Sequence, residues 1–176
     1  MGTSDNEFTN TRTNWAGLDW KQAQAQLLAL LSDYQFMRFE EVRLSKSKRA
    51  DLVVVRNSGS EIIYGVIEVK SYRKISNSVK VKALDQVCRY LNLLYQQTWN
   101  SQKYGKLPKK YFAAVVFTHD YPSSFQSEVT GQHISVLDQK LAELSEVFVC
   151  TPENLVSSLL NKNMVGLKQQ SLDDYY

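Results

Sequence analysis

Two apolar segments joined by a short turn constrain this chain more than any other feature. Residues 51–56 read DLVVVR, residues 61–70 read EIIYGVIEVK, and the four residues NSGS lie between them. Runs of Val and Ile without polar alternation are typical of buried strands, and Asn, Gly and Ser are typical of turns. The pattern therefore predicts an antiparallel hairpin inside a sheet.

Patterns on either side of the hairpin predict the rest of the sheet and its helices. A helix should begin after Asp19, a suitable N-cap residue, because apolar residues recur behind it at helical spacing (Trp20, Ala23, Leu27, Leu30 and Leu31). A second apolar stripe predicts a helix over 79–97 (Val81, Leu84, Val87, Leu91 and Leu94). Strands are expected over 34–44, 111–117 and 147–150, and helices over 132–144 and 152–160. The order α-β-β-β-α-β-α-β-α favours an α/β fold with helices on both faces of a mixed sheet.

The chain is expected to form one soluble domain. Its 176 residues match the usual length of a single domain, which we place at 14–168, between a disordered polar tail at 1–13 and a loose tail at 169–176. No segment approaches the ~18 apolar residues of a membrane helix, and the start of the chain lacks the apolar stretch of a signal peptide. We therefore expect a cytoplasmic, intracellular protein without a membrane partner.

Cysteine usage argues against several kinds of site. The chain has two cysteines, Cys88 and Cys150, which lie far apart and outside any CxxC pair. A disulfide framework, a cysteine-rich zinc site and a four-cysteine iron–sulfur cluster are therefore not expected.

Positive charge is concentrated in one part of the chain. Residues 43–110 hold fifteen Lys and Arg but four Asp and Glu, a local net charge of +11 against +3 for the whole chain. Such asymmetry favours an anionic partner such as DNA, although a solvated basic surface would give the same pattern. The candidate DNA-binding residues flank the hairpin: Lys46, Lys48, Arg49, Arg73, Lys74, Lys80, Lys82 and Arg89.

Two carboxylates and a lysine should meet on one face of the hairpin. Glu68 and Lys70 are two residues apart on one strand, so their side chains project to the same face. A four-residue turn at 57–60 would place Asp51 opposite Val66 and diagonal to Glu68, on that same face. Two carboxylates are hard oxygen ligands suited to Mg²⁺, and a neighbouring lysine can orient or deprotonate a water. The alternative is a surface ion pair between Glu68 and Lys70 on an edge hairpin.

These residues resemble the signature of the PD-(D/E)XK nuclease superfamily, with Ala50-Asp51 as its first half and Glu68-Val69-Lys70 as its second. Ala50 stands where the signature has proline. The resemblance implies a restriction-endonuclease-like α-β-β-β-α-β core over roughly residues 19–117. It also implies that Asp51 and Glu68 bind Mg²⁺ or Mn²⁺ and that Lys70 assists the attacking water.

A second motif follows on the predicted helix 79–97. Gln86 and Tyr90 are four residues apart and share a helix face, as in the QxxxY motif of RecB-type nucleases, which this pair resembles. The resemblance implies that both support the active site, although a helical tyrosine is also a common core residue. The first helix lacks an acidic residue in its interior, so Glu40 or Glu41 on the first strand could supply an additional acidic group, with Glu41 favoured; an exposed strand charge is the alternative.

The remaining candidate site residues give weaker indications of function. Two histidines cannot build the zinc and base set of an HNH nuclease, and we interpret His119 as a loop residue after a buried strand. The three tryptophans (Trp15, Trp20 and Trp99) are expected in the core or at its rim rather than as platforms for base stacking.

Together these observations predict a magnesium-dependent deoxyribonuclease, that is, an endonuclease or another enzyme that hydrolyses phosphodiester bonds. It would be of viral, mobile-element, restriction or repair type. One site per chain would favour a homodimer for cutting both strands of DNA. A nuclease-fold subunit that binds DNA or assembles with other proteins, with little or no catalysis, is the alternative. A third reading is an RNA-processing nuclease on the same scaffold.

Overall fold

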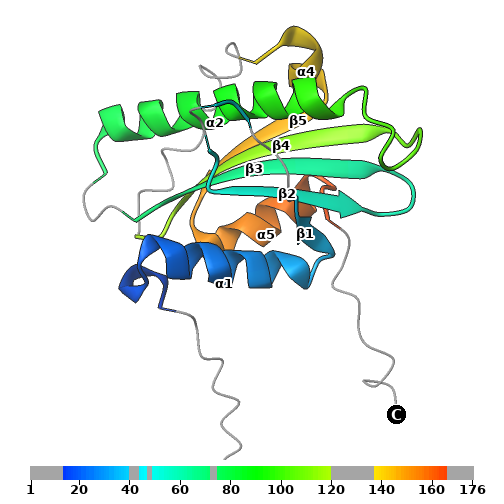
Figure 1. Ribbon diagram of the computed structural model, residues 1–176. Helices are drawn as coiled ribbons and strands as arrows, with labels where there is room; N and C mark the ends of the chain where they lie inside the picture. The colour runs from blue at the N-terminus through cyan, green and yellow to red at the C-terminus, as the bar shows by residue number, and fades with distance from the viewer. Residues whose placement is uncertain (1–13, 40–43, 47–48, 72–74, 120–136, 166–176) are drawn as a thin grey trace, which may run out of the picture.

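A five-stranded sheet forms the centre of the computed structural model, which describes residues 14–39, 44–46, 49–71, 75–119 and 137–165. In spatial order the strands are β1 (Phe36–Arg38), β2 (Leu52–Asn57), β3 (Ile62–Lys70), β4 (Lys109–Phe117) and β5 (Ser145–Cys150). The first three strands pair antiparallel, whereas β3, β4 and β5 pair parallel (Figure 1). The predicted mixed sheet is therefore confirmed.

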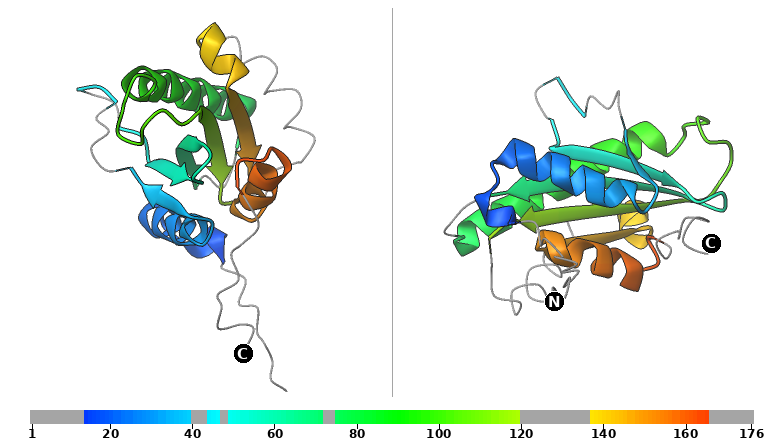
Figure 2. Two further views of the ribbon diagram at one scale, coloured as in Figure 1. Left: turned by 90° about the vertical axis from the view of Figure 1, so that its right-hand side faces the viewer. Right: turned by 90° about the horizontal axis from the view of Figure 1, so that it is seen from below.

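Helices cover both faces of this sheet. The long helix α2 (Asn77–Thr98) lies on one face, and α1 (Trp20–Ser32) and α5 (Pro152–Asn161) lie on the other (Figure 2). The short helices η1 (Trp15–Gly17) and α4 (Gln139–Glu143) complete the described elements. This arrangement confirms the predicted α/β class and the predicted helical cover.

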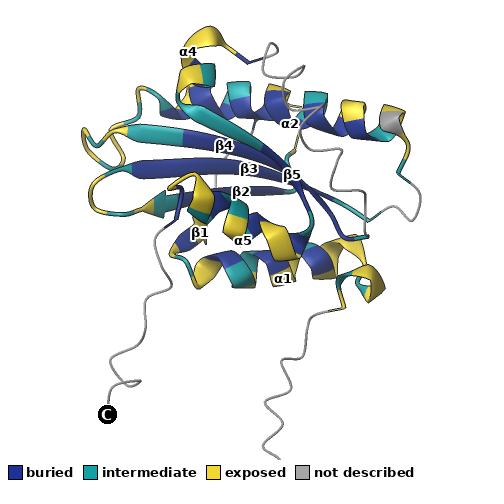
Figure 3. Ribbon diagram, turned by 180° about the vertical axis from the view of Figure 1, so that it is seen from behind, coloured by how far each residue is buried: buried dark blue, intermediate teal, exposed yellow. Residues whose placement is uncertain are grey.

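The two faces of the sheet carry two separate cores. Figure 3 shows that β3, at the centre of the sheet, is buried along almost its whole length. Along β3, Tyr64 and Val66 pack toward α2, and Ile63 and Ile67 pack toward α1 and α5. Gly65 is required between them, because a Cβ atom there would collide with the ring of Phe112. Burial on both faces explains why the strand sequences are apolar without alternation.

The starts of the helices follow from their capping residues. Asp19 accepts a hydrogen bond from the backbone of Gln22, whose side chain accepts one from the Asp19 backbone in return, a capping box. Ser76 accepts from the Val79 backbone at the start of α2, and Pro152 occupies the first turn of α5. The start of α1 directly after Asp19 and the start of α5 at Pro152 agree with the prediction.

The register of the hairpin differs from the predicted one by two residues. Val53, not Asp51, lies opposite Val66, because β2 continues through Asn57 and the loop occupies 58–61. Gly59 in this loop has a φ of +83°, a conformation that favours glycine. A shift of two residues preserves the face on which each side chain projects, so Asp51 comes level with Glu68 rather than diagonal to it.

Other predictions need correction. Trp20 and Val81 are 51% and 38% exposed although their spacing predicted core positions. Both lie near the amino ends of their helices. There the apolar stripe of the helix continues, but the side chains no longer pack against the core. The first strand covers Phe36–Arg38 within the predicted 34–44, and residues 40–43 lie outside the described part.

Several predictions fall wholly or partly on residues that the structure does not describe. The predicted helix 132–144 is represented by α4 over Gln139–Glu143, and residues 132–136 are outside the described ranges. Both predicted tails, 1–13 and 169–176, lie there too. Among the described helices, none has the length and apolarity needed to cross a bilayer.

Candidate active site

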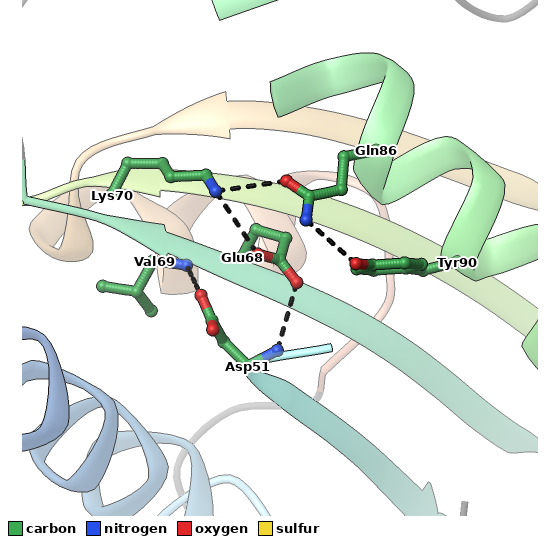
Figure 4. A network of polar contacts seen from close by, with 6 residues as sticks. All are labelled: Asp51, Glu68, Val69, Lys70, Gln86 and Tyr90. Carbon is green, nitrogen blue, oxygen red and sulfur yellow. Dashed lines mark hydrogen bonds and ion pairs between the residues drawn. The ribbon is translucent and has the colours of Figure 1, made fainter. Parts of the chain in front are cut away.

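Asp51 and Glu68 meet at the end of the hairpin through reciprocal backbone contacts (Figure 4). The Asp51 backbone N–H donates to Glu68 Oε1 at 3.1 Å, and the Val69 N–H donates to Asp51 Oδ2 at 2.8 Å. These bonds continue the pairing of β2 and β3 by one step, with side chains replacing backbone acceptors. The two carboxylates that are seventeen residues apart in sequence are thereby held side by side.

A chain of polar contacts extends from the carboxylates to α2. Lys70 Nζ lies 3.6 Å from Glu68 Oε2 and donates to Gln86 Oε1 at 3.2 Å. The Gln86 side-chain amide in turn donates to the Tyr90 hydroxyl at 2.9 Å. Figure 4 shows Glu68 and Lys70 on the side of β3 that faces α2. The structure therefore brings together all five residues of the two motifs.

The Glu68 carboxyl is buried in an unfavourable place for a negative charge. Only 2% of the residue is exposed, because the end of β3 is covered on both faces. Burial and, secondarily, the nearby Asp51 charge raise its pKa from 4.5 to about 7, although Lys70 acts in the opposite direction. A second positive charge beside these carboxylates would relieve that conflict.

The donor set at this point suits a hard divalent cation. The described residues contain no group of three or more His, Cys, Asp or Glu that could hold a metal, so protein ligation would rest on Asp51 and Glu68. Mg²⁺ commonly uses one or two carboxylates and keeps several waters, whereas structural zinc needs four protein ligands. The residues present therefore fit magnesium or manganese better than zinc.

A cavity of about 310 Å³ opens beside this network on α2, lined by Lys82, Asp85, Gln86, Arg89 and Tyr90. Gln86 and Tyr90 therefore connect the buried carboxylates to a surface hollow with two basic side chains. Asp85 was not among the predicted site residues. Its spacing of four from Arg89 on one helix face was the signal available in the sequence.

The predicted DNA-binding residues divide by burial. Lys46, Arg49, Lys82 and Arg89 are exposed, whereas Lys80 is 6% exposed and lies largely within the protein. The burial of Lys80 makes direct contact with a backbone phosphate less favourable there. Lys48, Arg73, Lys74 and the candidate acid Glu41 lie outside the described residues.

His119 lies two residues after the end of β4, as expected of a loop residue, and its Nδ1 lies 3.3 Å from the Thr118 hydroxyl. Trp99 packs at the edge of the core on α2, and Trp15 packs at the edge of the core beneath α1 and α5. Comparison of the chain with protein-family models, with curated proteins and with solved structures finds no match. The functional argument therefore depends on the residues and geometry described above.

Proposed function

We propose that this protein is a divalent-metal-dependent DNA nuclease that hydrolyses phosphodiester bonds. The observation that carries the proposal is the contact between Asp51 and the buried Glu68, with Lys70 held between Glu68 and Gln86. Buried like charges are costly, and the two backbone hydrogen bonds need only acceptors, which uncharged amides would also supply, so they do not account for two carboxylates here. A metal-binding role does give such a reason.

Within this proposal Asp51 and Glu68 hold Mg²⁺ or Mn²⁺. When bound, the metal supplies Lewis-acid stabilisation of the phosphate and lowers the pKa of a bound water. Lys70 has the distinct task of presenting an ammonium beside the carboxylates, where it can orient the attacking water or stabilise charge on the phosphate. Gln86 keeps the Lys70 ammonium in place, and Tyr90 fixes the Gln86 amide.

The finer fold assignment belongs to the same proposal. The order α1-β1-β2-β3-α2-β4 matches the α-β-β-β-α-β core expected of a restriction-endonuclease-like protein. Placement of the Asp51 and Glu68-Val69-Lys70 residues at one end of the β2–β3 hairpin supports membership of the PD-(D/E)XK superfamily. A homodimer would provide two such sites for the two strands of a duplex.

The decisive experiment is a cleavage assay with plasmid, single-stranded DNA, branched DNA and RNA in Mg²⁺, Mn²⁺ or EDTA. We expect metal-dependent cleavage of DNA that Glu68→Gln abolishes. Glu61→Gln is the matched control, because Glu61 precedes the same strand at its other end and pairs with Lys110 on the surface at 3.2 Å. Binding of DNA without cleavage would favour the non-catalytic subunit, and cleavage of RNA alone would favour the RNA-processing reading.

Phosphate binding is tested by the salt dependence of affinity. Each neutralised phosphate on a duplex releases counterions, so about five contacts should give a log–log slope near −4 to −5. Because Lys82 and Arg89 are exposed beside Gln86, replacing both with alanine should flatten the slope by up to about two units. Fluorescence anisotropy in Ca²⁺ measures the slope without relying on cleavage. An unchanged slope in the double variant would exclude this face of α2 from DNA contact.

A further inference from the structure

A second cavity lies near the candidate active site, at the same end of the sheet. It has a volume of about 290 Å³, and its walls come from residues 14–16, from Thr118 and His119, and from residues 151–153 at the start of α5. The Thr118 backbone N–H donates to the Lys70 carbonyl at 3.0 Å, because β4 pairs with β3 through Phe117 and Lys70. Figure 1 shows η1 near the ends of β3 and β4. Lys70 faces α2, whereas Trp15 packs on the side of α1 and α5, so a strand that reaches both places would cross this end of the sheet.

The lining of this cavity is suited to a flat, neutral group with polar edges. Trp15 supplies a large aromatic side chain that is only partly covered, and His119 supplies a second flat ring. The hydroxyl of Thr118, a residue that is 7% exposed, lies 3.3 Å from His119 Nδ1, which leaves Nε2 as the ring nitrogen able to meet a ligand. Stacking on such rings is how single-strand-binding proteins hold bases.

The side chains at this place favour a neutral group over a phosphate. None of the described lining residues is Lys or Arg, and the Glu153 carboxylate is one of the walls. A carboxylate only accepts hydrogen bonds at neutral pH, so it favours a group that offers N–H donors, such as the exocyclic amine of cytosine or adenine. The Asn14 amide and the Thr151 hydroxyl offer further partners for a base edge.

We infer that this cavity receives a nucleobase of the bound strand, stacked on Trp15 and read at its amino edge by Glu153. The inference rests on the proposed function, since it assigns a base in a strand that also passes the candidate active site at this end of the sheet. This pocket would give the protein a preference for one base at a single position of an unpaired strand. It also gives Trp15 the stacking role that the sequence pattern did not favour.

Coupling between Trp15 and one base tests the stacking. We would measure binding in Ca²⁺ by fluorescence anisotropy, using single-stranded oligodeoxynucleotides of about ten residues that carry one abasic site at each position in turn. At one position, loss of the base should weaken wild-type binding by about 5- to 100-fold. In Trp15→Ala the same loss should cost less than about twofold, because the stacking partner is already gone. Trp20→Ala is the matched control, since Trp20 is 51% exposed and does not line the cavity.

A second variant keeps the test decisive if Trp15→Ala folds poorly. Glu153 is exposed in the first turn of α5, so Glu153→Ala should leave the fold intact. The wild type should bind cytosine at the sensitive position about fivefold or more tightly than thymine, and Glu153→Ala should lose that preference. Equal losses on base removal in wild type and Trp15→Ala, or no effect of Glu153→Ala on base preference, would overturn the inference.

Failure of the inference and failure of the proposed function give different results. Metal-dependent cleavage with no coupling between Trp15 and any base would remove the base pocket and leave the nuclease. Coupling without cleavage would retain the pocket and remove the catalytic proposal. Absence of both cleavage and oligonucleotide binding would remove both.

Discussion

The polar groups at the two ends of β3 and β4 differ in whether their charges are matched by partners. At the amino end, Lys109 Nζ donates to the carbonyl oxygens of Thr98, Trp99 and Ser101 at 2.8, 2.7 and 3.0 Å. The Tyr111 hydroxyl lies 3.0 Å from the Thr98 hydroxyl, and its ring stacks on Tyr64. At the carboxyl end, by contrast, two carboxylates lie together and Lys70 is their neighbouring cation.

This difference separates groups that stabilise the fold from groups to which we assign a catalytic role. Lys109 places a positive charge on the carbonyl groups that end α2, where the helix dipole favours a cation. At the amino end, the positive charge of Lys109 therefore lies where the partial negative charge of the helix end attracts it. At the carboxyl end, burial and, secondarily, the Asp51 charge raise the pKa of Glu68. Such local conflict is expected where side chains serve a function at a cost in stability.

The largest expected effect is on cleavage. Asp51→Ala and Lys70→Ala should each lower the rate of metal-dependent cleavage by about 10³-fold or more, as removal of catalytic groups that act as a unit commonly does. Lys109→Met, at the other end of the sheet, should retain near wild-type cleavage per folded molecule. Single-turnover rates with circular dichroism as a fold check provide the measurement. Equal losses at both ends would show that cleavage reports only folding.

The next effect is on stability and has the opposite distribution. Lys109→Met removes three charge-assisted hydrogen bonds and should lower the free energy of unfolding by about 2 kcal/mol. Urea unfolding monitored by tryptophan fluorescence would measure this loss. Lys110→Met is the control, because the side chain of the neighbouring Lys110 is 40% exposed and its ion pair with Glu61 lies at the surface. A loss in Lys110→Met as large as that in Lys109→Met would contradict the proposed role of the Lys109 contacts.

A pH dependence of stability should come from the carboxyl end. Glu68 has a folded pKa of about 7, above the ordinary 4.5, so between these values the folded protein holds a proton that the unfolded chain releases. Stability in metal-free buffer should therefore fall as the pH rises from about 4.5 through 7. Glu68→Gln keeps the acceptor for the Asp51 N–H and removes the charge, so its melting temperature should decline less over this range. A parallel decline in both proteins would locate the pH dependence elsewhere.

The smallest effect compares two tyrosine hydroxyl groups on the same face of the sheet. Tyr111→Phe removes the contact with Thr98 and should destabilise the protein by about 1 kcal/mol. Tyr90→Phe removes the hydroxyl that accepts from Gln86 and should change stability by less than about 0.5 kcal/mol while slowing cleavage. Thermal melts and cleavage rates of the two variants give the comparison. Wild-type cleavage by Tyr90→Phe would assign that hydroxyl to structure alone.

Local sequence was sufficient to predict most of the secondary structure. Apolar runs marked β2, β3 and β4, and periodic stripes together with Asp19 and Pro152 marked the starts of helices. These signals are local because a strand or helix must present its apolar residues at a fixed period to reach a core. They also predicted that Glu68 and Lys70 share a face, since that depends on the strand repeat alone.

What the tertiary structure decided was register, burial and the meeting of distant residues. The strand β2 ends at Asn57, and Gly59 adopts a left-handed backbone conformation in the turn. Together they set the pairing that brings Asp51 level with Glu68, two residues from the predicted position. The contact from Lys70 to Gln86 requires α2 to lie over β3, and the cavity at Trp15 requires η1, β4 and α5 to converge. Trp20 and Val81 fit their stripes and are nevertheless exposed. Periodicity identifies the apolar side of a helix. Only the elements that pack against the helix determine how much of that side is buried.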